Sequence, residues 1–277
     1  MNPQKTIKGI TLILISSALF TNCKSHDEIK KETITNSPSA YAADPAIKQD
    51  SSKRYIYLTF DDAPQPPGTM ICKDIFTRQG VKATFFVVGL NQTDLKRKKI
   101  IDSIRSSYPQ FLIANHGYSH GFKNDYKSFY SKPDIAIQDF LKEEKDMKIP
   151  VKIIRLPGNN AWAGKDEMKG PKSVMPVCKQ LDSMGYTVIG WDIEWRFKNG
   201  HVPVQSTDEV VKEVNTKLDD NLTNESNTVV ILAHDRMFAK PPYTDSLNKF
   251  IATLKQDPRN VFETIDHYPL VQKSHGN

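Results

Sequence analysis

Residues 55–64, Tyr-Ile-Tyr-Leu-Thr-Phe-Asp-Asp-Ala-Pro, join an apolar, β-branched and aromatic run to two adjacent carboxylates and a proline. A short run of this composition favours a buried strand, and the proline marks where the strand ends. Successive side chains of a strand point in opposite directions, so Asp61 and Asp62 can take two roles, one binding a cation and one moving a proton. An acidic pair at this place can also be a turn or a helix cap, so the neighbouring motifs decide between the two interpretations.

Further β-rich runs follow this one, and polar or amphipathic stretches of helical length separate them. Such alternation of strands and helices favours a parallel sheet covered by helices. About seven strands in all predict a closed or nearly closed β/α barrel in a single α/β domain, although their spacing does not exclude an open sheet. The predicted strands are 55–60, 83–88, 111–114, 151–155, 186–191, 228–233 and 260–264, and the predicted helices are 69–79, 92–106, 134–147, 173–184, 207–220 and 243–256.

Polar and aromatic clusters come directly after the predicted strands. In barrels and in open α/β sheets alike, the carboxyl ends of parallel strands meet at one edge, where chemistry gathers. We therefore expect the clusters to form one site at one mouth of the fold. They are Asp61–Asp62 after the first strand, His116 and His120 after the third, Arg155–Pro157 after the fourth, Trp191–Trp195 after the fifth, and His234 after the sixth.

The histidines of these clusters indicate a metal site. His116 and His120 in His-Gly-Tyr-Ser-His are four residues apart, so that one helical turn or tight loop can aim both at one ion. Zinc commonly has three protein ligands and an open position for water, and an aspartate of the first cluster could be the third ligand. His234 could protonate a leaving group near neutral pH. Taken singly, each can also be an ordinary surface or hydrogen-bonded histidine.

In this order, the clusters TFDDAP, HGYSH, RLPG, WDIEW and LAH resemble the motifs of the polysaccharide deacetylase family, which includes chitin and peptidoglycan deacetylases. The resemblance covers residues 53–240. It implies a distorted (β/α) barrel with the site at its mouth, in agreement with the strand pattern. It also implies one divalent metal ion, Zn²⁺ first with Co²⁺ or Ni²⁺ as alternatives, bound by Asp62, His116 and His120.

The resemblance also implies the catalytic roles. Asp61 would be the general base, Arg155 would hold its carboxylate in place, and His234 would be the general acid. Glu194 stands where a carboxylate that orients this acid is expected, and Asp192 is the alternative.

Three of the motifs depart from the family pattern, one of them being Trp-Asp-Ile-Glu-Trp with Glu194, where the family usually has Asp-x-x-Asp-Trp. Ala63 stands where the family usually has glycine, and if the position needs a positive φ the methyl group costs roughly 1 kcal/mol. Pro157 and Gly158 stand in Arg-Leu-Pro-Gly, where the family usually has Arg-Pro-Pro-aromatic-Gly. We expect both to line the substrate site, with the Gly158 N–H serving an oxyanion and its missing side chain leaving room for a substituted sugar.

The tryptophans give weaker evidence for a substrate site than the polar motifs do. Indole faces stack well on sugar rings, so Trp162 and Trp195 are candidate substrate contacts. The alternative is that these side chains are buried in the core. That alternative is the preferred interpretation for Trp191.

The N-terminal residues indicate export. Lys5 and Lys8 precede an apolar run, residues 10–20, that is too short to span a bilayer, and Cys23 follows it closely. Residues 1–22 are therefore a predicted signal peptide of the lipoprotein type, in which Cys23 would carry lipid and attach the protein to a membrane. We expect an exported protein, periplasmic or at the cell surface.

The rest of the chain divides at residue 52. Residues 23–52 are polar and without hydrophobic periodicity, which predicts a flexible tether before a catalytic domain at 53–277. Cys72 and Cys178 are expected to be free, buried thiols. The formal charge of +6 becomes +4 when Lys5 and Lys8 are removed with the signal peptide (6 − 2), which suits anionic envelope material. No basic run is interleaved with aromatics, so no nucleic-acid partner is expected.

The sequence thus predicts a metal-dependent hydrolase that removes N-acetyl groups from a polymer containing N-acetylglucosamine. Peptidoglycan is the first choice of substrate and an exopolysaccharide the second. The alternatives are an esterase that removes O-acetyl groups from a polysaccharide, a hydrolase of small amides, and a barrel that binds envelope glycan without turnover. The last is the least favoured, because all five polar motif residues are intact: Asp61, Asp62, His116, His120 and His234.

Overall fold

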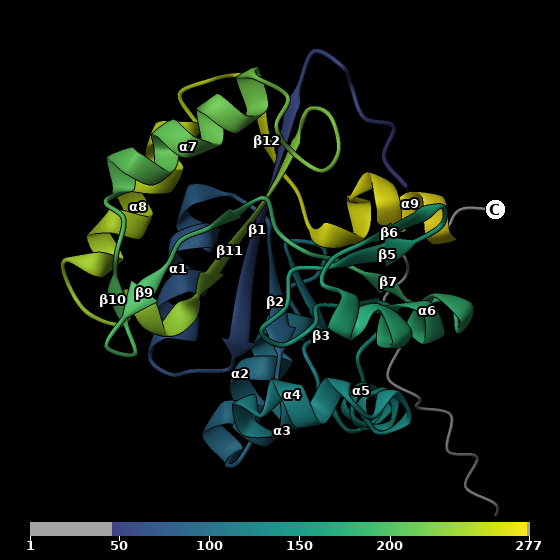
Figure 1. Ribbon diagram of the computed structural model, residues 1–277. Helices are drawn as coiled ribbons and strands as arrows, with labels where there is room; N and C mark the ends of the chain where they lie inside the picture. Colours follow the sequence, from purple (N-terminus) through teal and green to yellow (C-terminus); the bar gives the residue numbers. More distant parts are fainter. Residues whose placement is uncertain (1–45, 276–277) are drawn as a thin grey trace, which may run out of the picture. The chain divides into compact units, whose positions relative to one another are not determined.

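The computed structural model describes residues 46–275, and strand β1 (Arg54–Ala63) lies within its sheet, paired on both sides (Figure 1). All ten residues of β1 are buried. Ile56, Leu58 and Phe60 belong to the cluster that packs under helices, whereas Tyr57 belongs to a cluster on the other face. This alternation along the strand places Asp61 on the same face as Tyr57, away from the helix-covered core.

The sheet has ten strands and is curled but open. Its order is β6-β5-β7-β4-β3-β2-β1-β11-β8, with β12 also paired to β1, and within the described residues no pairing joins β6 to β8. The result is a distorted half-barrel, so the predicted α/β fold is confirmed and the sheet does not close. Its parallel members are β1, β2 (Ala83–Val87), β3 (Phe111–Asn115), β4 (Ile153–Ile154), β7 (Thr187–Val188), β8 (Ile193–Glu194), β11 (Thr228–His234) and β12 (Asn260–Phe262).

The seven predicted strands are all present, and three more strands of this sheet were not predicted. β5 (Trp162–Gly164) and β6 (Glu167–Lys169) add an antiparallel edge beyond β7. The predicted strand 186–191 is shorter than expected, because the chain leaves the sheet after β7 and pairs with β11 only at β8. A small separate sheet, β9 (Phe197–Lys198) with β10 (Val202–Pro203), follows β8.

Six helices match the six predicted segments. They are α1 (Gly68–Gln79), α2 (Leu95–Arg105), α5 (Pro133–Met147), α6 (Met175–Ser183), α7 (Thr207–Asp219) and α8 (Tyr243–Leu254). The helix start predicted near Thr207 is present as a capping box, in which Ser206 and Glu209 each bond the other's backbone N–H. The short helices α3 (His120–Asn124), α4 (Tyr126–Tyr130) and α9 (Pro269–His275) were not predicted.

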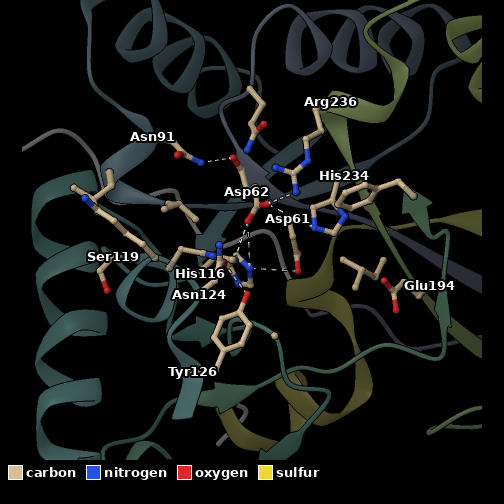
Figure 2. A pocket seen from close by; sticks show the side chains of 18 of the residues that line it. Asp61, Asp62, Asn91, His116, Ser119, Asn124, Tyr126, Glu194, His234 and Arg236 are labelled. Carbon is tan, nitrogen blue, oxygen red and sulfur yellow. Dashed lines mark hydrogen bonds and ion pairs between the residues drawn. The ribbon is translucent and has the colours of Figure 1, made fainter. Parts of the chain in front are cut away.

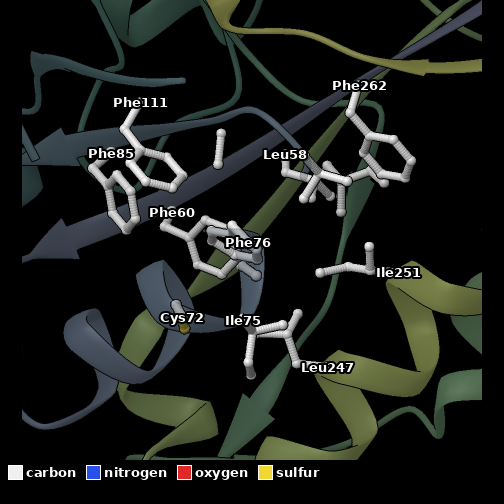
Figure 3. Packing of buried hydrophobic residues seen from close by; sticks show 14 of the residues in the cluster. Leu58, Phe60, Cys72, Ile75, Phe76, Phe85, Phe111, Leu247, Ile251 and Phe262 are labelled. Atoms are coloured by element: carbon white, nitrogen blue, oxygen red, sulfur yellow. The ribbon is translucent and has the colours of Figure 1, made fainter. Parts of the chain in front are cut away.

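The helices cover the sheet and bury its apolar face. α1, α7 and α8 pack together on one side of the sheet, and α5 and α6 pack together by β7 (Figure 1). Under α1 and α8, the rings of Phe60, Phe76 and Phe85 meet with centroid distances of 5.2 Å and 5.8 Å from Phe60 (Figure 3). Cys72 lies in this cluster and Cys178 in another, and both are free and buried, as predicted.

The predicted signal peptide, Cys23 and most of the predicted tether lie outside the described residues. The last part of the tether range contacts the domain, since Gln49 donates to the Tyr57 hydroxyl at 3.0 Å and the Asp50 N–H to the Tyr55 hydroxyl at 2.9 Å. Within residues 46–275, no helix is long and apolar enough to cross a membrane.

Candidate metal centre and active site

Both carboxylates at the end of β1 face one cavity, which the regular alternation of a strand would not allow. The register between β1 and β2 shifts between Phe60 and Ala63, and Asp62 adopts φ 68°. This irregularity turns Asp62 so that it lines the same cavity as Asp61. Ala63 is not among the residues with positive φ, so the methyl group carries no such strain there.

Asp62, His116 and His120 form a group that can hold a metal ion. One ligand atom from each lies within 4.8 Å of the others. Asp62 Oδ1 is 3.0 Å from His120 Nε2 and 3.8 Å from His116 Nε2, yet within residues 46–275 this buried oxygen has no well-aligned hydrogen bond. A buried carboxylate oxygen that faces two imidazole nitrogens without hydrogen bonds fits a divalent cation between them.

A backbone carbonyl orients the first histidine. His116 Nδ1 lies 2.9 Å from the Arg155 carbonyl oxygen, to which an Nδ1–H donates. That hydrogen bond leaves the Nε2 lone pair free to face Asp62, which is the arrangement common to metal-binding histidines.

Electrostatics give Asp62 and His116 the charge states that bind a cation. Burial lowers the pKa of His116, against the opposing effect of Asp61, so its imidazole is neutral near neutral pH. Burial alone would raise the pKa of Asp62, but the nearby imidazole of His120 lowers it overall, and the carboxylate is ionised. For His120 the two effects have opposite signs: burial alone would lower its pKa, but the Asp62 carboxylate raises it overall.

His120 begins an unusual left-handed turn. From His120 to Asn124 every φ lies between 50° and 80°, including those of Phe122 and Lys123. For residues with a side chain, this conformation costs roughly 1–2 kcal/mol each and seldom recurs in sequence. Such strain beside a metal-ligand histidine is typical of a functional site, where surrounding contacts enforce it.

Asp61 is held in place by a fully buried arginine. Arg155 Nη1 donates to Asp61 Oδ1 at 2.9 Å and to Thr59 Oγ1 at 2.6 Å, and its Nη2 donates to the Gly190 carbonyl at 2.7 Å. The other Asp61 oxygen is 3.5 Å from His116 Nε2. The structure therefore places Arg155 against Asp61, where the family resemblance implied it.

His234 faces the same cluster from the end of β11. Its Nε2 is 3.7 Å from Asp62 Oδ2, and its ring packs edge-on against Phe197 with centroids 4.8 Å apart. Burial lowers the pKa of His234 to about 4, against the opposing charges of Asp62 and Asp61. Its Nδ1 is buried and has no hydrogen-bond partner in the described part of the chain.

Neither carboxylate predicted to orient His234 bonds to it in residues 46–275. Asp192 was expected there as the alternative, but it accepts from the backbone N–H groups of Asn224 and Val230, both at 2.7 Å. This carboxylate therefore ties down the segment that enters β11. Glu194 does line the cavity, but its orienting role stays a prediction.

Three other residues predicted to contact substrate lie outside the cavity. Trp162 is 6% exposed and stacks on Tyr268, and Trp195 is 1% exposed and donates its indole N–H to the Gln205 carbonyl. Pro157 presents its carbonyl to Tyr130 at 2.7 Å and is absent from the lining. Both indoles are thus core residues, whereas Trp191, for which the core was preferred, lines the cavity.

Gly158 lines the cavity as predicted, but the room expected above it is filled. A Cβ at this position would lie 2.5 Å from Cε2 of Tyr126. The Gly158 N–H donates to no protein acceptor within the described residues.

The cavity has a volume of about 630 Å³ and includes side chains that the sequence motifs did not single out. Arg236 Nη2 donates to Asp62 Oδ2 at 2.9 Å (Figure 2). Its guanidinium lies over the Phe197 ring, 4.7 Å from the ring centroid. Asn91 Nδ2 donates to the Asp62 carbonyl at 2.7 Å. For Arg236, the available signal in the sequence was its position two residues after His234. No signal in the sequence marked Asn91, Tyr126 or Phe197, which also line the cavity.

Fold and site together define a class, an α/β half-barrel with an Asp–His–His cation site at the carboxyl ends of its strands. A family model described as polysaccharide deacetylase matches residues 48–158. These residues carry the Asp-Asp pair, both metal-site histidines and Arg155. Over residues 48–158 the chain matches the polysaccharide deacetylase family.

Known proteins of this kind are similar to the chain over different lengths. A chitooligosaccharide deacetylase of Bradyrhizobium sp. is 38% identical over 73 residues, which are 25% of this chain and 30% of that enzyme. The catalytic domain of a peptidoglycan N-acetylglucosamine deacetylase from Eubacterium rectale is 21% identical with a TM-score of 0.59, covering 84% of this chain and 97% of that one. A chitin deacetylase from Colletotrichum lindemuthianum is 20% identical with a TM-score of 0.55, covering 84% and 92%. The two structural similarities are evidence for the fold alone.

Proposed function

We propose that the protein is a metal-dependent hydrolase that removes N-acetyl groups from a polysaccharide containing N-acetylglucosamine. The observation that carries this proposal is the grouping of Asp62, His116 and His120 in one cavity with Asp61 and His234. A cation site with a carboxylate on one side and an imidazole on the other supplies what amide hydrolysis by water needs.

The residues fit a divalent ion held by Asp62, His116 and His120, since Asp62 Oδ1 is buried without a well-aligned hydrogen bond. When bound, such an ion supplies polarisation of the acetyl carbonyl and a lowered pKa of water. The pattern of nitrogen and oxygen ligands suits Zn²⁺ and also Co²⁺ or Ni²⁺.

The other residues move the protons. Asp61 accepts a proton from the attacking water, whose oxygen bonds to the acetyl carbon, and Arg155 keeps the Asp61 carboxylate in place. The Gly158 N–H, which has no protein acceptor in the described residues, donates to the developing oxyanion. His234 gives a proton to the sugar nitrogen as the carbon–nitrogen bond breaks, which yields acetate and an amino sugar. Because burial favours the neutral ring and the charges of Asp62 and Asp61 oppose it, turnover uses the fraction of the protein in which this imidazole is protonated.

For the polymer, we propose the N-acetylglucosamine of peptidoglycan, with an exported exopolysaccharide second. Two features support this choice. The charge of +4 that remains after the predicted signal peptide suits an anionic mesh, and Arg236 and Lys123 add basic groups to the cavity lining. The proposed location is the cell envelope, with the protein exported and attached through lipid on Cys23.

An acetate-release panel tests the reaction. The full chain would be loaded with Zn²⁺ and incubated with chitooligosaccharides, peptidoglycan and acetylated xylan, each with and without a chelator. We expect acetate from the N-acetylated substrates and its loss with the chelator. Release from acetylxylan alone would make the protein an O-acetyl esterase, and release from none would leave a glycan-binding protein.

Comparison of cell walls tests the polymer. After muramidase digestion, a strain without the gene should yield fewer glucosamine-containing fragments by mass spectrometry than its parent. Identical fragment profiles under conditions of expression would transfer the proposal to the exopolysaccharide.

A further inference from the structure

An aromatic ring from α4 sits in a slot between two glycines beside the metal-binding group. A Cβ at Gly158 would lie 2.5 Å from Tyr126 Cε2 and 2.6 Å from its Cζ. A Cβ at Gly121 would lie 2.8 Å from Tyr126 Cδ1 on the other side of the slot. Real Cβ atoms do not approach other carbons so closely, so the ring needs glycine at both positions.

The backbone at both glycines favours the same conclusion. Gly121 has φ 60° and Gly158 has φ 66°, in the left-handed region that glycine adopts without strain. Two segments far apart in the sequence, the turn after β3 and the loop after β4, therefore leave space for one side chain. The ring of Tyr126 fills that space.

The ring also contacts the metal-binding group and faces the cavity. It packs edge-on against His120 with centroids 5.9 Å apart, and its hydroxyl donates to Asn124 Oδ1 at 2.9 Å. Tyr126 is half-buried and lines the cavity, unlike its neighbours Phe129 and Tyr130, which are fully buried. Figure 2 shows it across the metal-binding group from Arg236.

We infer that Tyr126 is a substrate-contacting, specificity-determining residue, whose ring forms the wall against which the N-acetylated sugar packs. This inference rests on the proposed function. A tyrosine ring offers an apolar face to the C–H groups of a sugar or to an acetyl methyl group, and a polar end to water. Anchored at both glycines and at Asn124, the ring is fixed before the sugar binds, so little conformational entropy is lost on contact.

The first test removes the ring. In Tyr126→Ala we expect KM for tetra-N-acetylchitotetraose to rise about tenfold, with a smaller change in kcat, because the ring already touches the sugar in the bound ground state. Tyr126→Phe should restore most of the affinity, since it keeps the ring. The matched control is Phe122→Ala, which removes an exposed ring from the preceding turn, outside the cavity.

A second measurement does not depend on turnover. Calorimetry of the metal-free full chain with the same tetrasaccharide should show a dissociation constant about tenfold higher for Tyr126→Ala than for the wild type. Zn²⁺ affinity of this variant should stay within about threefold of the wild type, because no metal ligand is removed.

A third measurement tests the slot. Gly158→Ala should lower sugar affinity in the wild type by displacing the ring, and should lower it far less in the Tyr126→Ala background, where the ring is gone. Equal losses in both backgrounds would mean that the slot is not the cause.

The outcomes separate this inference from the proposed function. If the wild type releases acetate but Tyr126→Ala leaves both KM and sugar affinity unchanged, the inference is wrong and the function stands. If Tyr126→Ala chiefly loses Zn²⁺ affinity, the ring positions His120 and does not contact sugar, which also overturns the inference. If no acetate is released but sugar binding depends on Tyr126, the function fails and the inference stands. Absence of both turnover and sugar binding would overturn both.

Discussion

Asp61 and Asp62 are neighbours in sequence, yet the two sides of the site around them are built differently. Asp61 lies on a floor of buried groups, Thr59 and Arg155, in which the arginine donates to two side chains and two backbone carbonyls. Asp62 belongs to a rim that it forms with His120 and Arg236. The side chains of His120 and Arg236 are partly exposed, and the backbone is left-handed at Asp62 and His120. A fully bonded floor fixes the proton acceptor, whereas the less bonded rim leaves a carboxylate oxygen available to an ion.

The largest effect expected is at the rim. Replacing His120 with alanine removes one of the three ligands, so the protein should lose both its stoichiometric metal and its turnover. Metal analysis by mass spectrometry and acetate release would measure the two. His201→Ala, in the turn between β9 and β10 and outside the cavity lining, is the control, and full metal content in the His120 variant would remove this residue from the site.

At the floor, the largest effect is on stability. Arg155→Met leaves the Asp61 carboxylate buried without its cation, and breaking a buried pair in this way costs about 3–5 kcal/mol. Urea unfolding of the metal-free proteins measures it. The control is Arg259→Met, whose ion pair with Asp257 is screened by solvent, so its loss should change the unfolding free energy far less. Equal losses in both variants would contradict the distinction between floor and surface.

The substitution Asp61→Asn should separate catalysis, which depends on the floor, from metal binding, which depends on the rim. The amide keeps an acceptor for Arg155 but is a poor base, so the rate should fall by about 10² or more while metal stays bound. Metal content and kcat on an acetylated oligosaccharide measure the two effects. Normal turnover would mean that another group takes the proton from water.

The regions that the sequence predicted well are those where local pattern and local geometry agree. β1, β3 and β11 are buried strands of five residues or more, and their ends place the polar residues that follow them. Because parallel strands end at one edge, Asp61, His116 and His234 could be expected to meet. The bulge at Asp62 was not foreseen, since register with β2 and not composition determines it.

Prediction was poorer between residues 157 and 195. β4 and β7 have two residues each, so the direction of every later side chain depends on where the curled sheet releases the chain. Trp162 and Asp192 accordingly find partners far away in sequence, Tyr268 and the backbone of Val230. The left-handed turn that delivers Tyr126 to the cavity also lay beyond prediction, because only tertiary contacts can enforce such a conformation on residues with side chains.

A smaller effect at the rim is expected from Arg236→Met. The guanidinium binds Asp62 Oδ2 and so holds Oδ1 toward the imidazoles, and loss of such an outer partner lowers metal affinity by about tenfold or more. Arg236 also repels a cation, but its side chain is 31% exposed and water screens that repulsion. A Zn²⁺ competition titration decides, and tighter binding in the variant would mean that repulsion is the stronger effect.

The smallest expected effect is on the pH dependence of stability and comes from Asp235, the buried residue that follows His234. Its buried carboxylate accepts from the Thr69 hydroxyl and from the Gln65 N–H at 3.3 Å, and burial raises its pKa to about 7. Between the ordinary aspartate pKa of 3.8 and about 7, the folded protein binds a proton that the unfolded chain has released, so this group makes stability fall as pH rises through that window. Asp235→Asn keeps an acceptor and does not ionise, and between pH 5 and pH 6 the unfolding free energy of the wild type should fall relative to the variant by about 1 kcal/mol. Urea unfolding of both proteins without metal measures the difference. Parallel pH profiles would mean that Asp235 is ionised throughout this range, and that the rim rests on a buried charge instead of a neutral carboxyl group.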